Sequence, residues 1–192
     1  MTKLPYDPDQ IEVRLAISTD EIKAAQALRY KVFYDEYGAT PTEEMEREKR
    51  DIDSYDDITD HLVVLDRDLP AGPDQIIGTY RLLRREVAEK YGQFYTSDEY
   101  DIQPLLDYDK DLLELGRSCV LPIYRTRPVL QKLWQGIAHY VADHNIGLMF
   151  GCASLHGTDV NKLSEQLAYL YHYHKAPRHL CPKALSSRYV DM

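Results

Sequence analysis

The stretch that decides the fold of this chain is Leu112-Leu-Glu-Leu-Gly-Arg-Ser-Cys-Val-Leu-Pro-Ile-Tyr-Arg-Thr-Arg-Pro128. Its first part is an apolar strand in which Glu114 and Arg117 lie three residues apart. Removing a charged side chain from water is costly unless the charge is paired, so we expect each of these residues to meet the other, a ligand or a wet cleft. Alternation along a regular strand would place them on opposite faces, and a bulge or a splay of the strand would bring them to the same face.

The second part of the stretch is a basic turn that opens a helix. Arg125, Thr126 and Arg127 precede Pro128, and proline is favoured in the first turn of a helix. Free N–H groups and the helix dipole attract anions to such a terminus. A strand carboxylate beside a phosphate site indicates acyl transfer from a phosphopantetheine-type donor.

Length and composition indicate a globular protein. The chain has 192 residues, of which 44% are hydrophobic and 29% charged, enough for one well-cored domain. A net charge of −9 argues against nucleic acid as a partner. No apolar run reaches the roughly 18–20 residues of a membrane span, and the N-terminus lacks the apolar core of a signal peptide. The scattered cysteines indicate a reduced cytoplasm.

Hydrophobic periodicity predicts a mixed α/β architecture with an antiparallel meander in the middle. Ser18 and Glu21 form a capping box before the first helix. The expected elements are strand 11–17, a helix to about residue 37, a short helix and loop over 39–60, strands 61–66 and 75–84, a tyrosine-rich functional loop over 86–111, the Glu114 strand, helix 128–144, strand 148–154 and a helix from about 159 to 175.

Four segments resemble a known family. They are Ala27–Glu36, Ile76–Arg84, Glu114–Val120 and Phe150–Ser154. In this order they resemble the bacterial ornithine–acyl carrier protein N-acyltransferases, some of which are labelled haemolysin-like. The resemblance spans roughly residues 15–192. It implies the fold of the GCN5-related N-acyltransferase superfamily, a central mixed sheet flanked by helices, in a single N-acyltransferase domain over residues 1–192.

The resemblance also implies a function. We expect transfer of a (3-hydroxy)fatty acyl group from acyl carrier protein to the α-amino group of ornithine, giving lyso-ornithine lipid. The co-substrate is then the phosphopantetheine thioester of the carrier, with no bound cofactor and no metal. The expected location is the cytoplasm, with peripheral contact with the inner membrane. Three alternatives stay open: another acceptor such as glycine, lysine or tyrosine, lactone synthesis, or a non-catalytic carrier-binding module.

A more distant resemblance is to the acyl-homoserine lactone synthases. The shared residues are Arg29, Phe33, Asp53, Asp56, Arg81, Glu114 and Arg117. Arginine binds carboxylates through two parallel hydrogen bonds, so the arginines and aspartates of this set are expected to bind the carboxylate and ammonium groups of the acceptor. Phe33 is expected to belong to the same substrate-binding site. The alternatives are a solvated helix face for Arg29 and a surface acidic loop for Asp53 and Asp56.

Glu114 is the predicted general base. An α-amino group titrates near pH 8, so part of it must lose a proton before attack, and a strand carboxylate could take that proton. The alternative is a structural ion pair with Arg117. On the donor side we expect backbone N–H groups at Cys119, Val120 and Leu121 to stabilise the oxyanion. The phosphopantetheine arm and the carrier surface are expected to be held by Arg125, Thr126, Arg127 and Lys132.

The chain departs from the resembled families in two places. Arg125-Thr-Arg-Pro-Val-Leu130 replaces the glycine-rich pyrophosphate turn of acetyl-CoA-using relatives, which fits a donor carried on a protein. The chain also stops where the ornithine acyltransferases continue, so the last strands of the fold are expected to be missing. Cys119 and Cys152 are interpreted as structural rather than nucleophilic, because buried cysteines are common in cores.

Overall fold

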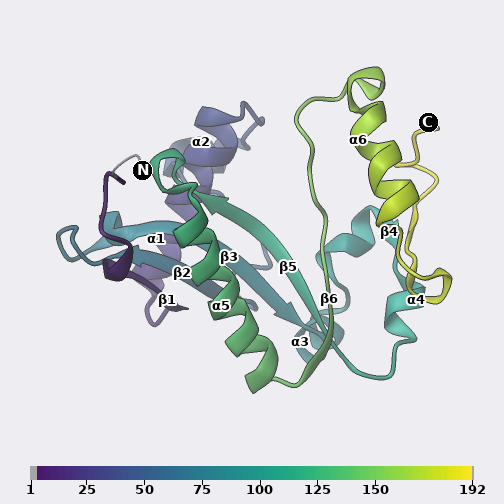
Figure 1. Ribbon diagram of the computed structural model, residues 1–192, viewed down its shortest axis with the longest axis horizontal. Coiled ribbons are helices and arrows are strands. Elements are labelled where there is room, and N and C mark those ends of the chain that lie inside the picture. The colour runs from purple at the N-terminus through teal and green to yellow at the C-terminus, as the bar shows by residue number, and fades with distance from the viewer. Residues whose placement is uncertain (1–3, 192) are drawn as a thin grey trace.

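The structure is a computed structural model that describes residues 4–191 (Figure 1). A five-stranded sheet has the order β1-β2-β3-β5-β6. Its strands are β1 (Ile11–Leu15), β2 (Asp60–Asp66), β3 (Ile76–Arg84), β5 (Asp111–Val120) and β6 (Ile146–Phe150). Neighbours among the first four are antiparallel, and β6 runs parallel to β5. This is the mixed sheet with an antiparallel meander that the sequence predicts.

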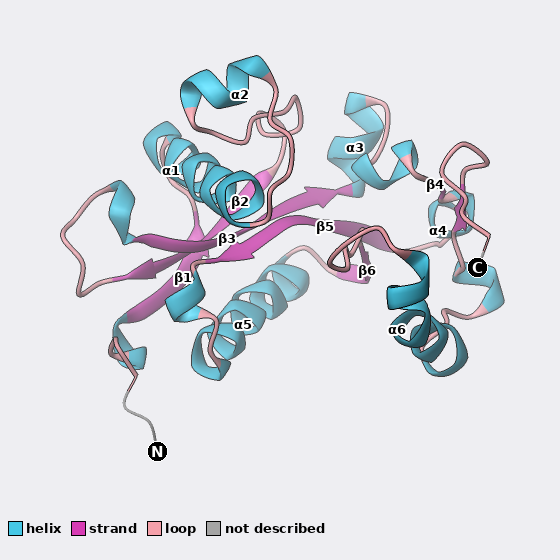
Figure 2. Cartoon of the chain, turned by 90° about the horizontal axis from the view of Figure 1, so that it is seen from above, coloured by secondary structure: helices cyan, strands magenta, loops and turns pink. Residues whose placement is uncertain are grey.

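Helices cover both faces of the sheet. The helices of the described residues are α1 (Thr19–Tyr30), the π-helix Lys31–Glu36, α2 (Glu43–Glu48), α3 (Arg85–Tyr91), α4 (Gln103–Leu106), α5 (Arg127–Asp143) and α6 (Val160–Tyr173). Figure 2 shows α1 and α2 on one side of the sheet and α5 on the other. Strands buried on both faces are hydrophobic without alternation, which explains the run Leu62–Leu65, all of it buried.

The two faces have separate cores. On one face, Val129, Leu133 and Ile137 of α5 pack against the sheet in a cluster that includes Leu62 and Leu113. Each fully buried side chain of this size contributes about 1.5–3 kcal/mol. On the other face, a second cluster joins α1 to the sheet, with Ala25, Leu28, Val32, Val63, Leu65, Ile76 and Cys119.

The first helix begins and ends as predicted, with a change of hydrogen bonding inside it. The Ser18 hydroxyl accepts the N–H of Glu21 at 3.3 Å, and the Glu21 carboxylate accepts the N–H of Ile17 at 2.8 Å. The last turns form the π-helix Lys31–Glu36, and Gly38 follows in the left-handed region (φ 73°). Such π-helical segments are frequent at functional sites.

The structure corrects two expectations. Residues 86–111 do not form a loop: they contain most of α3, the 3-10 turn Tyr95–Asp98, β4 (Tyr100–Asp101) and α4. These elements are too short to show a period in the sequence. The strand expected over 148–154 is instead β6, Ile146–Phe150, and it ends before Gly151.

The segment after β6 is the most exposed part of residues 4–191. The N–H of Asn161 donates to the Asp159 side chain at 3.1 Å at the start of α6, and none of the residues of α6 is buried. β7 (Lys183–Ala184) pairs with β4 in a separate two-stranded sheet. Within residues 4–191, β6 is the last strand on its edge of the main sheet.

Over the same residues, no helix combines the length and the apolar character needed to cross a membrane.

Candidate active site

Strands β5 and β6 diverge at Glu114. Their pairing ends with Glu114 beside Phe150, and over the described residues β5 continues to Val120 without a strand on that side. Gly151 lies so close to β5 that a Cβ atom there would collide with the carbonyl oxygen of Leu115. The chain then turns away from β5 and runs to α6 (Figure 1). The outer backbone edge of β5 beyond Glu114 is therefore left without a β-ladder.

The carboxylate of Glu114 lies at this point of divergence and is 4% exposed. The N–H of Tyr95 donates to its Oε2 at 2.8 Å, and the N–H of Thr96 donates to its Oε1 at 2.7 Å. The hydroxyl of Thr96 also donates to Oε1. Burial raises the pKa of Glu114, and these hydrogen bonds together with the charge of Arg81 offset part of the rise. Glu114 is therefore more basic than a solvated carboxylate.

Arg117 reaches the face covered by α1 because β5 contains a bulge, one of the two irregularities expected from the sequence. Between the pairs Thr79–Cys119 and Arg81–Gly116, β5 has one more residue than β3. Arg117 sits in this irregularity with φ 49°. Its guanidinium pairs with aspartates of another segment rather than with the strand carboxylate, so the two charged residues of the strand have separate partners.

A network of ion pairs fills the space between α1, the sheet and the segment that follows α2. It joins three arginines from three elements to three aspartates from that segment. The members are Arg29, Arg81, Arg117, Asp51, Asp53 and Asp56.

The closed end of the network is centred on Arg29, which is fully buried. Its Nε lies 2.8 Å from Asp51 Oδ2, and its Nη2 lies 2.7 Å from Asp56 Oδ2. Gln26 donates to Asp56 at 3.0 Å. Burial alone would raise the pKa of Asp56, but the hydrogen bond from Arg29 and the charges of Arg29 and Arg81 lower it to about 2. This end is a fixed scaffold of charges without solvent access.

The open end of the network consists of Asp53 and Arg117. Their side chains are 20% and 25% exposed, and Arg117 Nη2 lies 3.1 Å from Asp53 Oδ2. The ring of Tyr95 lies 5.2 Å from the guanidinium carbon of Arg117 and 5.7 Å from that of Arg81. Because Tyr95 also donates its N–H to Glu114, the turn that holds the carboxylate covers the network as well.

The basic turn is partly neutralised by the protein itself. Arg125 forms a two-point ion pair with Glu36, with distances of 2.5 and 2.7 Å, and its Nε donates to the carbonyl oxygen of Val120 at 2.8 Å. Lys132 donates to the carbonyl oxygen of Ile11 at 2.8 Å. The guanidinium of Arg125 is thus tied to the end of β5, beside the diverging edge.

The remaining residues of the turn differ in their surroundings. Thr126 precedes α5, and its hydroxyl bonds to the hydroxyl of Tyr6 instead of capping the helix. Arg127 is the first residue of α5 and is exposed. Within residues 4–191 its side chain makes no ion pair or hydrogen bond. Its charge is therefore the part of the turn that remains for an external anion.

The three predicted oxyanion positions are not equivalent. Cys119 points toward α1, and burial raises the pKa of its thiol to about 12. The N–H of Leu121 donates to the carbonyl oxygen of Ile77 at 2.9 Å. Hydrogen-bonding directions alternate along an antiparallel strand, so the N–H of Val120 points away from β3, toward the diverging edge. Of the three, Val120 is the donor that the geometry leaves available.

Phe33 lies in the π-helix and packs, partly buried, against the second core cluster. No hydrogen bond or ion pair among the described residues joins it to the network; its neighbour Tyr34 contacts the network instead, through a hydroxyl that donates to Asp51 at 2.8 Å. Burial and this bond raise the pKa of Tyr34 to about 12. Asp51 and Thr96 were not among the residues predicted from the sequence, and nothing in their local sequence marks them. Tyr95 is one of several tyrosines that the sequence offers as the lining of an acyl tunnel, and the structure places it against Glu114 and Arg117.

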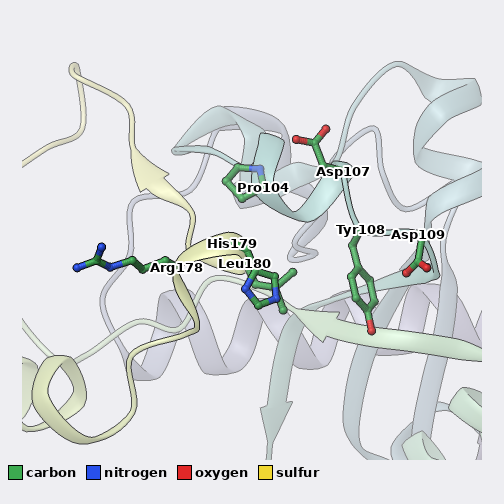
Figure 3. A pocket seen from close by; sticks show the side chains of 7 residues that line it. All are labelled: Pro104, Asp107, Tyr108, Asp109, Arg178, His179 and Leu180. Carbon is green, nitrogen blue, oxygen red and sulfur yellow. The ribbon is translucent and has the colours of Figure 1, made fainter.

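The structure also contains a hollow that none of the predicted site residues lines. It measures about 500 Å³ and lies between α4 and the C-terminal segment (Figure 3). Its walls are Pro104, Asp107, Tyr108, Asp109, Arg178, His179 and Leu180. Two of its lining residues, Tyr108 and Leu180, pack in the same hydrophobic cluster as Phe150, but none of them belongs to the candidate site, so the hollow does not extend that site.

Comparisons with known proteins identify the family. Residues 28–135 match the family described as Acetyltransferase (GNAT) domain. L-ornithine N(alpha)-acyltransferase of Rhodobacter capsulatus is 42% identical over 96% of this chain and 72% of its own length. Proteins of the same name from Rhizobium meliloti and Brucella abortus are 49% and 46% identical, over 84% and 95% of this chain. The chain spans 56% and 66% of the lengths of these two relatives.

Solved structures share the fold. A putative N-acetyltransferase from Lactobacillus plantarum superimposes with a TM-score of 0.50 at 17% identity, covering 91% of this chain and 94% of that one. The AHL synthase LasI gives a TM-score of 0.51 at 12% identity, covering 91% and 86%. The expected superfamily fold is confirmed. The chain belongs to the GNAT acyltransferases and, within them, to the family of the L-ornithine N(alpha)-acyltransferases.

Proposed function

We propose that the chain transfers a fatty acyl group from a thioester donor to the α-amino group of ornithine. The observation that carries this proposal is the position of Glu114. This buried carboxylate lies where β5 and β6 diverge, and the turn that holds it also covers the open end of the ion network. Glu114 can then serve as the base for the amine. The diverging edge of β5 beside it can hold the thioester, and the open end of the ion network can hold the charged groups of the acceptor. The names of the relatives support ornithine as the acceptor.

The acceptor is proposed to bind at Asp53 and Arg117, the two members of the network with the greatest exposure. The guanidinium of Arg117 suits the carboxylate of an amino acid, and Asp53 suits an ammonium group. Arg29, Arg81 and Asp56 are too buried for direct contact and would hold the two binding residues in place. Their role in the predicted acceptor site is thus proposed to be indirect.

The proposed chemistry is direct transfer. Glu114 removes a proton from the α-ammonium group, directly or through one water, and the free amine attacks the thioester carbon. A carbon–nitrogen bond forms and the carbon–sulfur bond breaks. The nitrogen loses a second proton as it becomes an amide, and the leaving sulfur takes up one proton and departs as a thiol. The N–H of Val120 is proposed to stabilise the oxyanion, a contribution typically worth a factor of about 10²–10³ in rate.

The donor is proposed to be an acyl carrier protein. Its phosphopantetheine arm would lie along the unpaired edge of β5, with Arg127 and the Arg125–Glu36 pair facing the carrier. An extended arm can use backbone groups that no strand occupies, and Arg127 can meet an acidic partner. A 3-hydroxylated acyl group, lyso-ornithine lipid as the product, and a cytoplasmic enzyme in peripheral contact with the inner membrane complete the proposal.

The test is a competition among acceptors. The purified chain is incubated with 3-hydroxyacyl carrier protein and equimolar ornithine, lysine, glycine and tyrosine, and the products are identified by mass spectrometry. We expect Nα-acylornithine to dominate. Preference for another amino acid would overturn the acceptor assignment. Binding of the carrier without any product would instead favour a carrier-binding module.

A further inference from the structure

Three hydrogen bonds from one turn fix the carboxylate of Glu114. Thr96 supplies two of the donors, its N–H at 2.7 Å and its hydroxyl, and Tyr95 supplies the third at 2.8 Å. An ionised carboxylate has about four acceptor positions. Both bonds from Thr96 go to Oε1, so the unused position lies on Oε2, which among residues 4–191 accepts only the N–H of Tyr95.

The hydroxyl of Thr96 also lies between Glu114 and the segment that leaves β6. The thiol of Cys152 donates to the oxygen of Thr96 at 3.5 Å, and Cys152 is exposed. Thr96 itself is 4% exposed. One side of this hydroxyl thus faces the region where β5 and β6 diverge, and the other side holds the carboxylate.

The charge state of Glu114 depends on few groups. Arg81 from β3 is the cation whose charge stabilises the ionised carboxylate. Tyr55 comes from the segment after α2, and Cys152 from the segment after β6, and both are close enough to interact with its charge. Burial works against ionisation, so the donors of the turn are the main groups that keep the carboxylate charged.

We propose that Thr96 is a positioning residue that holds Glu114 in its ionised form, with Oε2 directed toward the acceptor. The role of Thr96 rests on the proposed function, in which Glu114 is the base. A base must be ionised to accept a proton, so loss of the hydroxyl donor shifts the pH at which Glu114 becomes active upward. The threonine methyl group plays no part in this role, and a serine at the position therefore fulfils it.

The test compares pH profiles of kcat/KM, which report groups of the free enzyme, for the wild type and Thr96→Val, Thr96→Ser and Ser97→Ala. Ser97 lies in the same turn, and within the described residues its side chain makes no hydrogen bond. We expect the acidic limb of Thr96→Val to move up by about one pH unit, with about a tenfold loss below the limb. Thr96→Ser and Ser97→Ala should keep the wild-type limb.

The outcomes separate the two proposals. An unshifted limb in Thr96→Val, with Glu114→Gln inactive, would overturn the role of Thr96 and leave Glu114 as the base. A uniform loss of activity without a shift would assign Thr96 a purely structural role and also overturn the proposal. Full activity of Glu114→Gln would remove the proposed base itself. If Thr96→Val does not fold, a Thr96→Ser limb that differs from the wild type decides against the proposal, and a matching limb supports it.

Discussion

Replacement of Arg29 by methionine tests whether the ion network is a buried scaffold. The guanidinium of Arg29 is fully buried and pairs with Asp51 at 2.8 Å and Asp56 at 2.7 Å. Removing one partner of a buried pair costs about 3–5 kcal/mol. In the variant, Asp51 still pairs with Arg117, and Asp56 still pairs with Arg81. We therefore expect the free energy of unfolding to fall by about 3 kcal/mol, the lower bound of this range. The total free energy of unfolding of a protein is about 5–15 kcal/mol, so the expected loss is a large fraction of it.

The free energy of unfolding is measured by urea titration, followed by circular dichroism. Arg67→Met is the matched control, because Arg67 pairs with Glu12 at the surface and its side chain is 40% exposed. Exposed pairs contribute about 0.2–1 kcal/mol. In thermal unfolding, the Arg29→Met variant should lose about 6–12 °C in Tm. If Arg29→Met costs no more than Arg67→Met, the network does not stabilise the fold in the way described.

Three further outcomes are expected. The pKa of Asp56 is lowered from 3.8 to about 2, so the stabilisation from its ionised carboxylate is present above pH 4 and is lost as the pH falls through 2. Between pH 4 and pH 2, Asp56→Asn should therefore lose less unfolding free energy than the wild type. Cys119→Ala should keep most of the activity, and peptide mapping after iodoacetamide treatment should find Cys152 labelled well before Cys119. The double variant Arg125→Glu, Arg127→Glu should weaken binding of the carrier protein and reduce the salt dependence of that binding, with a smaller effect on a synthetic thioester donor. An equal loss of activity with both donors would contradict a role specific to the carrier.

Local patterns were sufficient to predict the main elements. The apolar spacing of α5 and its proline-containing first turn define a helix that the structure confirms over Arg127–Asp143. The three-residue offset of Glu114 and Arg117 predicts an irregular strand, either a bulge or a splay, and the structure has a bulge in β5. In both cases the decisive residues are neighbours in the sequence, and their period or spacing carries the physical information.

The site could be predicted only in part, because its contacts join residues that are distant in the sequence. The sequence around Asp51 is rich in acidic residues and indicates a solvated segment. Only the structure shows that Asp51 pairs with Arg29 and Arg117. Thr96 has no apolar period around it, and its role follows only from the bond to Glu114. Short elements and buried polar contacts leave little trace in a single sequence.

Glu114→Gln tests the central claim most directly. The substitution keeps the shape of the side chain and removes its ability to act as a base. With acyl carrier protein as donor and ornithine as acceptor, we expect turnover to fall by roughly 10²–10⁴, with carrier binding nearly unchanged. Glu89→Gln, at an exposed carboxylate on α3, serves as the control and should have wild-type turnover. Turnover of Glu114→Gln within a few-fold of the wild type would contradict the assignment of Glu114 as the base.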